Sequence, residues 1–316
     1  MKKPSSRQPR PRVIVVVKRS ALARLGDGVL DPRAEALLKS GHLAVRKWQP
    51  AHDDHERSVD KVLGVLEKSG VNALVLRGAQ ASFDPSGADL IVTVGGDGTL
   101  LAASHSVSGV PILGVNSAPK YSVGFFCSAT ERTAARAIAE ALSGQLSYVD
   151  LARMQVSIGG AVRATRILNE ALFCHAEPAA TSNYWLRVGR TTEEQKSSGL
   201  WIGPPAGSTG ALLSAGGTVL PLTSGELQFV VREPYVGDGR SYKLVHKVLS
   251  SRQELIVTSK MHHARIFLDG PYHSLAVRLG DEVRFGLSHE PLRVLGLSRD
   301  RSAALRVARR YSRARA

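Results

Sequence analysis

The sequence predicts an α/β amino-terminal domain with a parallel sheet, followed by a β-rich, β-sandwich-like carboxy-terminal domain. Short apolar strands alternate with helical stretches up to about residue 144, and beyond it strand follows strand with few helical windows. The segment IVTVGGDGTLL, residues 91–101, reads as a buried strand that runs into a glycine-rich turn and a helix. With 316 residues, 43% of them hydrophobic, the chain is long enough for two domains of ordinary size.

The α/β domain is predicted over residues 13–145. Strands that alternate with helices form a parallel sheet, and ligands bind at the carboxyl ends of such strands. The clearest helix lies at 58–67, where apolar residues recur at the spacing of one helix face. The expected strands are 13–17, 74–76, 90–94 and 111–115, and the expected helices are 58–67 and 131–142.

The β-rich dinucleotide-binding domain is predicted over residues 146–297. Its segments show apolar runs or alternation between apolar and polar residues, which is typical of strands. The expected strands are 154–158, 162–173, 184–188, 200–202, 227–231, 254–258, 265–268, 274–278, 282–286 and 292–295.

Most of the formal net charge of +15 lies in two tails. Residues 1–12 carry five basic side chains, and residues 299–316 carry seven arginines and one aspartate. We expect 1–12 to be a disordered basic tail and 298–316 to be a basic tail or helix. The middle of the chain is only mildly basic and lacks the interleaved aromatic and basic residues of single-strand binders, so no nucleic-acid partner is expected.

The chain shows no sign of export or of a membrane partner. It has no run of roughly 18 apolar residues, and its start, MKKPSSRQPRPR, lacks the apolar core of a secretion signal. Cys127 and Cys174 offer neither a disulfide framework nor metal-ligand spacing. We therefore expect a cytoplasmic protein.

The glycine-rich turn GGDGT is the strongest candidate for a site. Gly95, Gly96 and Gly98 leave backbone amides open to anionic oxygens, and a helix that opens near Thr99 adds its positive end. Asp97 would repel phosphate as a mere binder, so it is better explained as a base for a hydroxyl or as a metal ligand beside a phosphate in transfer. The alternative is a tight strand-to-helix turn with no chemical role.

Polar residues interrupt the apolar run RILNEALF at Asn169 and Glu170. If buried without partners, each would cost about 1 to 3 kcal/mol. Asn can pair with a base edge, and Glu can accept from a ribose hydroxyl or an amide. A solvent-facing or bulged strand position is the alternative.

A third segment, GLWIGPPAGSTGALLSAGG, spans residues 199–217. Ser208 or Thr209 can cap the short apolar helix that follows, while the amides of the turn face an anion or a ribose. A plain helix cap explains this segment equally well. A last polar turn, Asp269-Gly270, ends the run RIFLDG.

Together these segments resemble the NAD kinase family, which phosphorylates the adenosine-ribose 2′-hydroxyl of NAD to give NADP. The resemblance rests on GGDGT, on the pair NE, on SSGLWIGPPAGSTGALLSAGG and on the late DG, which occur in the family's order between about Val13 and Leu297. The run EQKSSGL, the REP at 232–234 and the interval from Asn116 to Gly124 are most similar to the mitochondrial-type branch and its bacterial relatives. The resemblance implies the NAD kinase/diacylglycerol kinase-like fold.

The resemblance also implies a role for each candidate residue. Asp97 draws the proton from the 2′-hydroxyl, and the glycines around it hold the phosphates of the donor and the dinucleotide. Asp269 lies in a late turn at the subunit or ligand edge. The other implied binding residues are Phe125 and Phe126 beside the adenine, Asn169 and Glu170 on the adenine and ribose, and Ser198, Ser208, Thr209 and Ser214 along the dinucleotide.

Three positions differ from many members of the family. Ser198 replaces an aspartate, Pro204-Pro205-Ala206 replaces Thr-Pro-Thr, and Gly210-Ala211 replaces Ala-Tyr. The serine is shared with the mitochondrial-type branch. The lost tyrosine removes a stacking surface, which bears on the contacts to the nicotinamide side.

The implied reactants are NAD as substrate and ATP as phosphoryl donor, with Mg²⁺ carried by the nucleotide phosphates, in a homodimer. Polyphosphate remains an alternative donor, and NADH remains an alternative acceptor.

Two other functions also remain possible from the sequence. A lipid kinase of the diacylglycerol or sphingosine type shares GGDGT, but the Asn-Glu pair suits a purine nucleotide. A catalytically silent dinucleotide-binding protein would fit the changes at Ser198, Gly210 and Ala211, although Asp97 argues against it.

Overall fold

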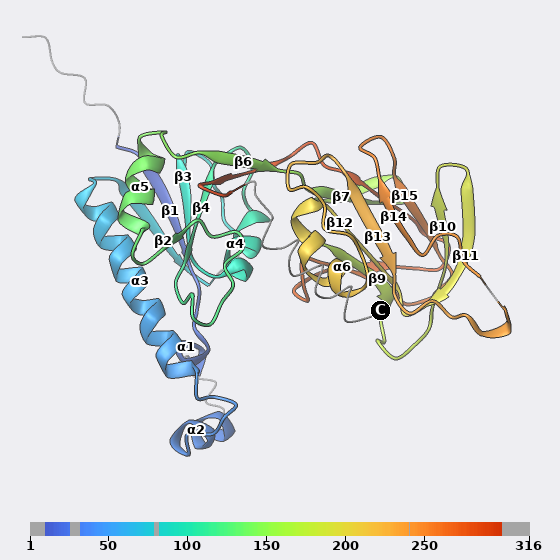
Figure 1. Cartoon of the computed structure of the whole chain (residues 1–316), viewed down its shortest axis with the longest axis horizontal. Coiled ribbons are helices and arrows are strands. Elements are labelled where there is room, and N and C mark those ends of the chain that lie inside the picture. Colours follow the sequence, from blue (N-terminus) through green and yellow to red (C-terminus); the bar gives the residue numbers. More distant parts are fainter. Residues whose placement is uncertain (1–9, 26–31, 79–81, 240, 299–316) are drawn as a thin grey trace, which may run out of the picture. The chain divides into compact units, whose positions relative to one another are not determined.

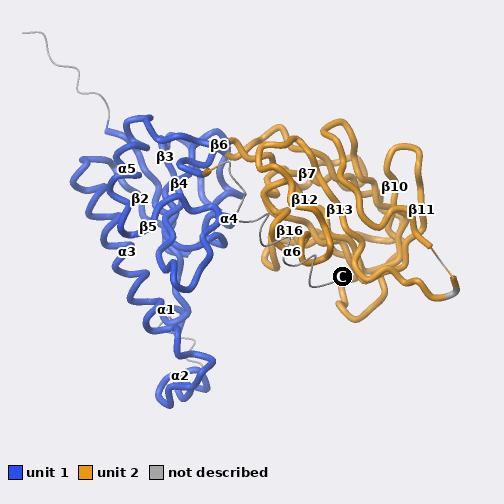
Figure 2. Tube along the Cα trace, viewed as in Figure 1, with its two compact units in different colours: residues 1–149, 293–297 blue, residues 150–292, 298–316 orange. Residues whose placement is uncertain are grey.

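The computed structural model describes residues 10–25, 32–78, 82–239 and 241–298, so both predicted basic tails lie almost wholly outside it. The chain divides into two compact units (Figure 2). Of the described residues, unit 1 comprises those up to 149 and 293–297, and unit 2 comprises those from 150 to 292 and residue 298.

The described residues of unit 1 form a seven-stranded sheet with the strand order β2-β1-β3-β4-β19-β6, in which β5 also pairs with β4. β1 to β5 and β19 pair in parallel. β1 and β3 are almost wholly buried, because helices cover both faces of the sheet. The strands are β1 (Arg12–Val17), β2 (Asn72–Arg77), β3 (Leu90–Gly95), β4 (Ile112–Asn116), β5 (Ala129–Thr130), β6 (Tyr148–Leu151) and β19 (Leu292–Leu295).

Helices cover this sheet on two sides. Figure 1 shows α3 and α5 on one side of the sheet and α4 on the other. The buried stripe Val59, Val62 and Leu66 of α3 packs in the same core as alternate residues of β1, β3 and β4. The helices are α1 (Ala21–Leu25), α2 (Pro32–Lys39), α3 (Trp48–Lys68), α4 (Asp97–Ser104) and α5 (Ala134–Leu142).

Unit 2 contains two six-stranded antiparallel sheets, with the orders β11-β10-β15-β18-β7-β8 and β14-β13-β12-β9-β16-β17. Their inward side chains share one apolar core, which is the arrangement of a β-sandwich. The predicted fold class is confirmed. The strands are β7 (Met154–Ile158), β8 (Ala161–Ile167), β9 (Ala171–His175), β10 (Ser182–Val188), β11 (Thr191–Ser197), β12 (Leu200–Gly203), β13 (Leu227–Val231), β14 (His246–Leu249), β15 (Leu255–Ser259), β16 (Ala264–Leu268), β17 (His273–Val277) and β18 (Glu282–Leu287), with short helices η1 (Pro205–Thr209), α6 (Ala211–Ser214) and η2 (Gly237–Gly239).

Four strands, β5, β6, β11 and β14, were not predicted, and two of the expected strands differ from the prediction. The strand expected over 162–173 is broken at 168–170, which separates β8 from β9. The last expected strand, assigned to the β-rich domain, becomes β19 and pairs in parallel with β4 of unit 1 through Val294 and Ile112. A four-residue apolar run predicts a strand, but it carries no information about which sheet the strand joins.

Candidate active site

The GGDGT turn lies between β3 and α4, at the carboxyl end of a central strand. Gly95 has to be a glycine for an internal reason, because a Cβ there would lie 2.1 Å from Thr99 Oγ1 and 2.7 Å from Thr99 Cβ. A Cβ on Gly96 would lie 2.3 Å from Ser122 Oγ, a hydroxyl that can rotate away. Gly98 is exposed and has nothing within 4 Å of its Cβ position. Gly95 therefore shapes the turn, and Gly98 leaves open space beside the helix start.

Asp97 is the first residue of α4 and is half-buried. Its Oδ1 accepts a hydrogen bond of 2.7 Å from the backbone N–H of Phe126. This bond fixes the direction of the carboxylate at the edge of the turn. Asp97 also affects Cys127: burial and then the Asp97 charge raise the pKa of this thiol to about 12, so it stays neutral near pH 7.

The loop after β4 brings the phenylalanine pair to Asp97. Asn116 Nδ2 donates to the Ser122 carbonyl at 3.1 Å, and Gly124 has a positive φ of 66°. A side chain on Gly124 would collide with Asn116. The ring of Phe126 is buried in an edge-to-face contact with half-buried Phe125, so Phe126 meets Asp97 through its backbone.

A buried histidine, which the sequence analysis missed, ties α3 to the strands beneath the turn. His55 is 2% exposed; its Nδ1 lies 2.9 Å from Ser117 Oγ, and its Nε2 lies 2.8 Å from the Lys18 carbonyl. Ser117 N in turn donates to the Gly95 carbonyl at 2.9 Å. Burial lowers the pKa of His55. The spacing of His55 with Val59, four residues along the apolar stripe, was the available signal.

In unit 2, Asp269 explains the break between β8 and β9. Its Oδ2 accepts from Leu168 N at 2.9 Å, and its Oδ1 accepts from Asn169 N at 2.7 Å and from Glu170 N at 3.1 Å. In return, Asp269 N donates to the Glu170 carbonyl at 2.9 Å. Asp269 has φ 51°, a left-handed conformation that aspartate tolerates better than most residues. One carboxylate therefore accepts hydrogen bonds from all three N–H groups, so these groups do not pair with a neighbouring strand.

Two glycines pack directly on the Asn169 peptide. A Cβ on Gly203 would lie 2.3 Å from the Asn169 carbonyl oxygen, and a Cβ on Gly207 would lie 1.8 Å from it. The GPPAGST segment is therefore shaped around the backbone of Asn169 and Glu170. Burial and then the charge of Asp269 raise the pKa of Glu170 to about 7, so its carboxyl can donate a hydrogen bond at neutral pH.

The hydroxyls of this segment play different parts. Ser208 is fully buried, donates to the Pro205 carbonyl at 2.7 Å and accepts from Leu220 N at 3.0 Å. Thr209 is half-buried, and Ser214 is exposed and bonds back to the Gly210 carbonyl at 3.4 Å. The prediction that Ser208 or Thr209 caps the next helix is wrong: Gly210 precedes α6, without a side-chain cap. The Ser208 hydroxyl is engaged within η1, so it is not available to the helix.

Ser198 lies in the turn between β11 and β12. Its N–H donates to the Arg232 carbonyl at 3.0 Å, and its carbonyl accepts from Arg232 Nη1 at 3.3 Å. The Arg232 guanidinium stacks over the Trp201 ring at 5.6 Å. Arg232 therefore holds the backbone of Ser198 rather than its side chain.

Comparisons with known proteins identify the family. The family model described as "ATP-NAD kinase N-terminal domain" matches residues 39–146. The "Probable NADH kinase" of Oryza sativa subsp. japonica is 31% identical over 263 residues, which cover 76% of this chain and 81% of that protein. The chain belongs to the NAD kinase family. The "NADH kinase" of Arabidopsis thaliana is also 31% identical, over 283 residues, 78% of this chain and 86% of that protein.

Solved structures of the NAD kinase family share this fold. The NAD kinase of Archaeoglobus fulgidus in complex with ATP aligns with a TM-score of 0.65 at 20% identity, covering 94% of this chain and 96% of that one. The yeast NADH kinase complexed with NADH aligns with a TM-score of 0.68 at 15% identity, covering 97% of this chain and 91% of that one. The family predicted from the sequence is confirmed.

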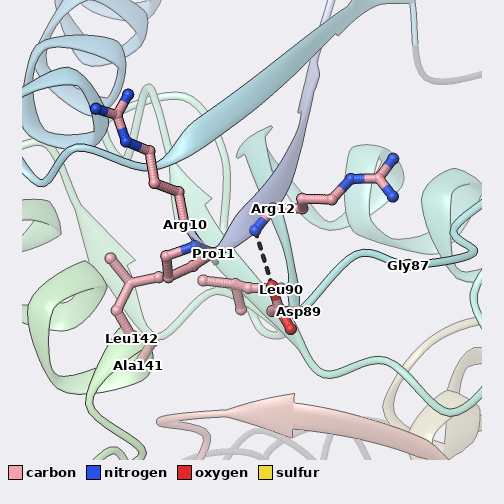
Figure 3. Close-up of a pocket in the computed structure, with 8 residues that line it drawn as sticks. All are labelled: Arg10, Pro11, Arg12, Gly87, Asp89, Leu90, Ala141 and Leu142. Carbon is pink, nitrogen blue, oxygen red and sulfur yellow. Dashed lines mark hydrogen bonds between the residues drawn. The ribbon is translucent and has the colours of Figure 1, made fainter. Parts of the chain in front are cut away.

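The candidate residues of this NAD kinase family member fall into separate groups in the two units. In the part of the chain that the structure describes, no three His, Cys, Asp or Glu side chains gather as a metal site, and no helix is long and apolar enough to cross a membrane. A pocket of about 440 Å³ lies elsewhere, at the amino ends of β1 and β3 (Figure 3). The side chains of Arg10 and Arg12 point away from each other there, so they do not form one anion site.

Proposed function

We propose that this protein transfers the terminal phosphoryl group of ATP to the adenosine-ribose 2′-hydroxyl of NAD or NADH, giving NADP or NADPH. The observation that carries the proposal is Asp97, whose carboxylate is held by Phe126 N at the start of α4, next to the open space at Gly98. The match to NADH kinases and to an NAD kinase over most of the chain supports the choice of reactants.

In this proposal Asp97 acts as the general base. The ribose 2′-oxygen attacks the γ-phosphorus, the bond from phosphorus to ADP breaks, and the hydroxyl proton passes to Asp97. The amides near Gly98 and the start of α4 offset phosphate charge. Because the described residues offer no ligand cluster of their own, Mg²⁺ would arrive with the ATP phosphates and reduce their charge.

Asn169 and Glu170 are the residues proposed to bind adenosine. Their backbone is fixed on three sides, by Asp269, Gly203 and Gly207, so the two side chains have a defined starting direction. A partly protonated Glu170 can donate to a ring nitrogen as well as accept from a hydroxyl. This polar pair favours a purine nucleotide over the acyl chain of a lipid kinase substrate.

Incubation of the purified protein with NAD or NADH, ATP and Mg²⁺ tests the proposal, with NADP(H) as the product measured. We expect product from at least one acceptor. NAD binding without product would support the silent dinucleotide-binding alternative, and phosphorylation of diacylglycerol or sphingosine would support a lipid kinase. Replacing ATP by polyphosphate identifies the donor. A homodimer, implied by the family resemblance, is a separate proposal that sedimentation equilibrium tests.

Asp97→Asn is the decisive variant. The amide oxygen can still accept from Phe126 N, so the fold should persist, while the base is lost. We expect turnover to fall by about 10²- to 10⁴-fold with NAD binding nearly unchanged. An equal loss of binding and turnover would show that Asp97 has a structural role.

A further inference from the structure

Lys18 lies at the GGDGT turn although it is far from it in the sequence. It directly follows β1, whose last residue, Val17, is in register with Val94 of β3. Lys18 N donates to the Val94 carbonyl at 2.9 Å. A Cβ on Gly95 would lie 3.1 Å from Lys18 Cβ. The lysine side chain therefore starts beside the first glycine of the turn, at the carboxyl edge of the sheet.

The backbone of Lys18 is fixed, and its side chain is exposed. Its carbonyl is bonded to Nε2 of buried His55 at 2.8 Å. A carbonyl can only accept, so this nitrogen carries the proton, and in the neutral ring Nδ1 accepts from Ser117 Oγ. The base of the lysine is thus held by α3, and its four-carbon stem can reach a ligand above the turn.

Lys18 forms no ion pair with any residue that the structure describes. Of the described charged groups, the Arg24 guanidinium of α1 is the one that acts on the pKa of Lys18. Although Lys18 as a whole is exposed, partial desolvation of its ammonium and then the charge of Arg24 lower the pKa of Lys18. The repulsion between two neighbouring cations falls when an anion binds between or beside them.

We infer that Lys18, with Arg24 as its neighbour, binds the outer phosphates of the phosphoryl donor at the GGDGT turn. The inference rests on the proposed function for the identity of the donor. It adds a cation to a turn that otherwise supplies amides and one carboxylate. The ammonium forms no covalent bond; it offsets the charge of the transferred or leaving phosphate.

The test compares Lys18→Met, Lys18→Arg and Arg24→Met with Lys61→Met, a control on the exposed face of α3. Calorimetry measures the dissociation constant for ATP without NAD, and steady-state kinetics measures the Michaelis constants for both substrates. For Lys18→Met we expect about 10- to 100-fold weaker ATP binding, a shallower dependence on salt and little change for NAD. Lys18→Arg should keep most of the affinity, and Arg24→Met should show a smaller loss.

Thermal unfolding of each variant excludes misfolding. The inference is overturned if Lys18→Met binds ATP as tightly as Lys61→Met does, even when the wild type makes NADP(H). It also fails if the wild type does not bind ATP. If the wild type binds ATP in a manner that depends on Lys18 but makes no NADP(H), then the proposed function fails while the phosphate-binding role of Lys18 stands.

Discussion

Glu170→Gln should stabilise the protein at alkaline pH and leave its stability almost unchanged at acidic pH. Burial and Asp269 raise the pKa of Glu170 from an ordinary 4.5 to about 7 in the folded protein. The folded state therefore prefers the protonated carboxyl. The stability that this preference gives is fully present below pH 4.5 and is lost as the pH rises through about 7. Glutamine keeps the shape of the protonated acid at every pH.

The size of the effect follows from the shift. At about 1.4 kcal/mol per pKa unit, raising the pKa of Glu170 to about 7 disfavours its ionised form by about 3 kcal/mol. Part of this stabilisation is already lost at about pH 5, because Glu170 of the unfolded chain is largely ionised there. Between about pH 5 and about pH 8.5, the wild type should lose about 2.5 kcal/mol that Glu170→Gln does not lose.

Urea unfolding at these two pH values measures the difference in unfolding free energy between variant and wild type, so that other titrating groups cancel. Glu177→Gln, an exposed glutamate of the same unit, is the control and should show no such change. A Glu170→Gln difference that is equal at both pH values would refute the argument, because it would mean that Glu170 ionises without a penalty in the folded protein.

Three further outcomes follow from the same contacts. Asn169→Ala should raise the Michaelis constant for NAD by the equivalent of about 1 to 3 kcal/mol, and an unchanged constant would remove Asn169 from the site. Asp269→Asn places a donor against the Leu168 to Glu170 N–H groups; it should lower the unfolding free energy by at least about 1 to 3 kcal/mol and weaken the pH dependence that Glu170 causes, both measured by urea unfolding. Because the pKa of His55 is lowered in the folded protein, its contribution to the unfolding free energy is present above about pH 6.5 and is lost as the pH falls below that value. His55→Asn should remove this contribution to the pH dependence, measured by urea unfolding at several acidic pH values. An unchanged pH dependence would mean that it has another origin.

The sequence was sufficient for the fold class, for most strands and for the family. Uninterrupted apolar runs such as 90–94 predict buried parallel strands, because both of their faces need cover. The strand-to-glycine transition at Gly95 locates the turn, because few other structures need such a junction. Local patterns of this kind predict an element even when its partner strand is unknown.

Contacts between distant segments were not predictable. The carboxylate of Asp269 holds the N–H groups of residues about a hundred positions away, and this bond, rather than any local propensity, breaks the strand at Asn169. The same holds for His55, whose bonds to Lys18 and Ser117 depend on how α3 packs. Each case requires the pairing of elements to be known first.

The three glycines of the GGDGT turn show that a sequence motif alone does not tell which of its residues leave room for a ligand. Gly95, Gly96 and Gly98 carry the same signature in the sequence, yet Gly95 is required by Thr99, Gly96 borders the hydroxyl of Ser122, and only Gly98 borders open space. Gly207 likewise is required by the Asn169 carbonyl. A glycine can thus be obligatory because the protein's own atoms fill the space of a side chain, or it can leave that space to a ligand. In this turn the open space lies beside Gly98 and the neighbouring Asp97, where we propose that the ligand binds, whereas Gly95 is fixed by the shape of the turn itself.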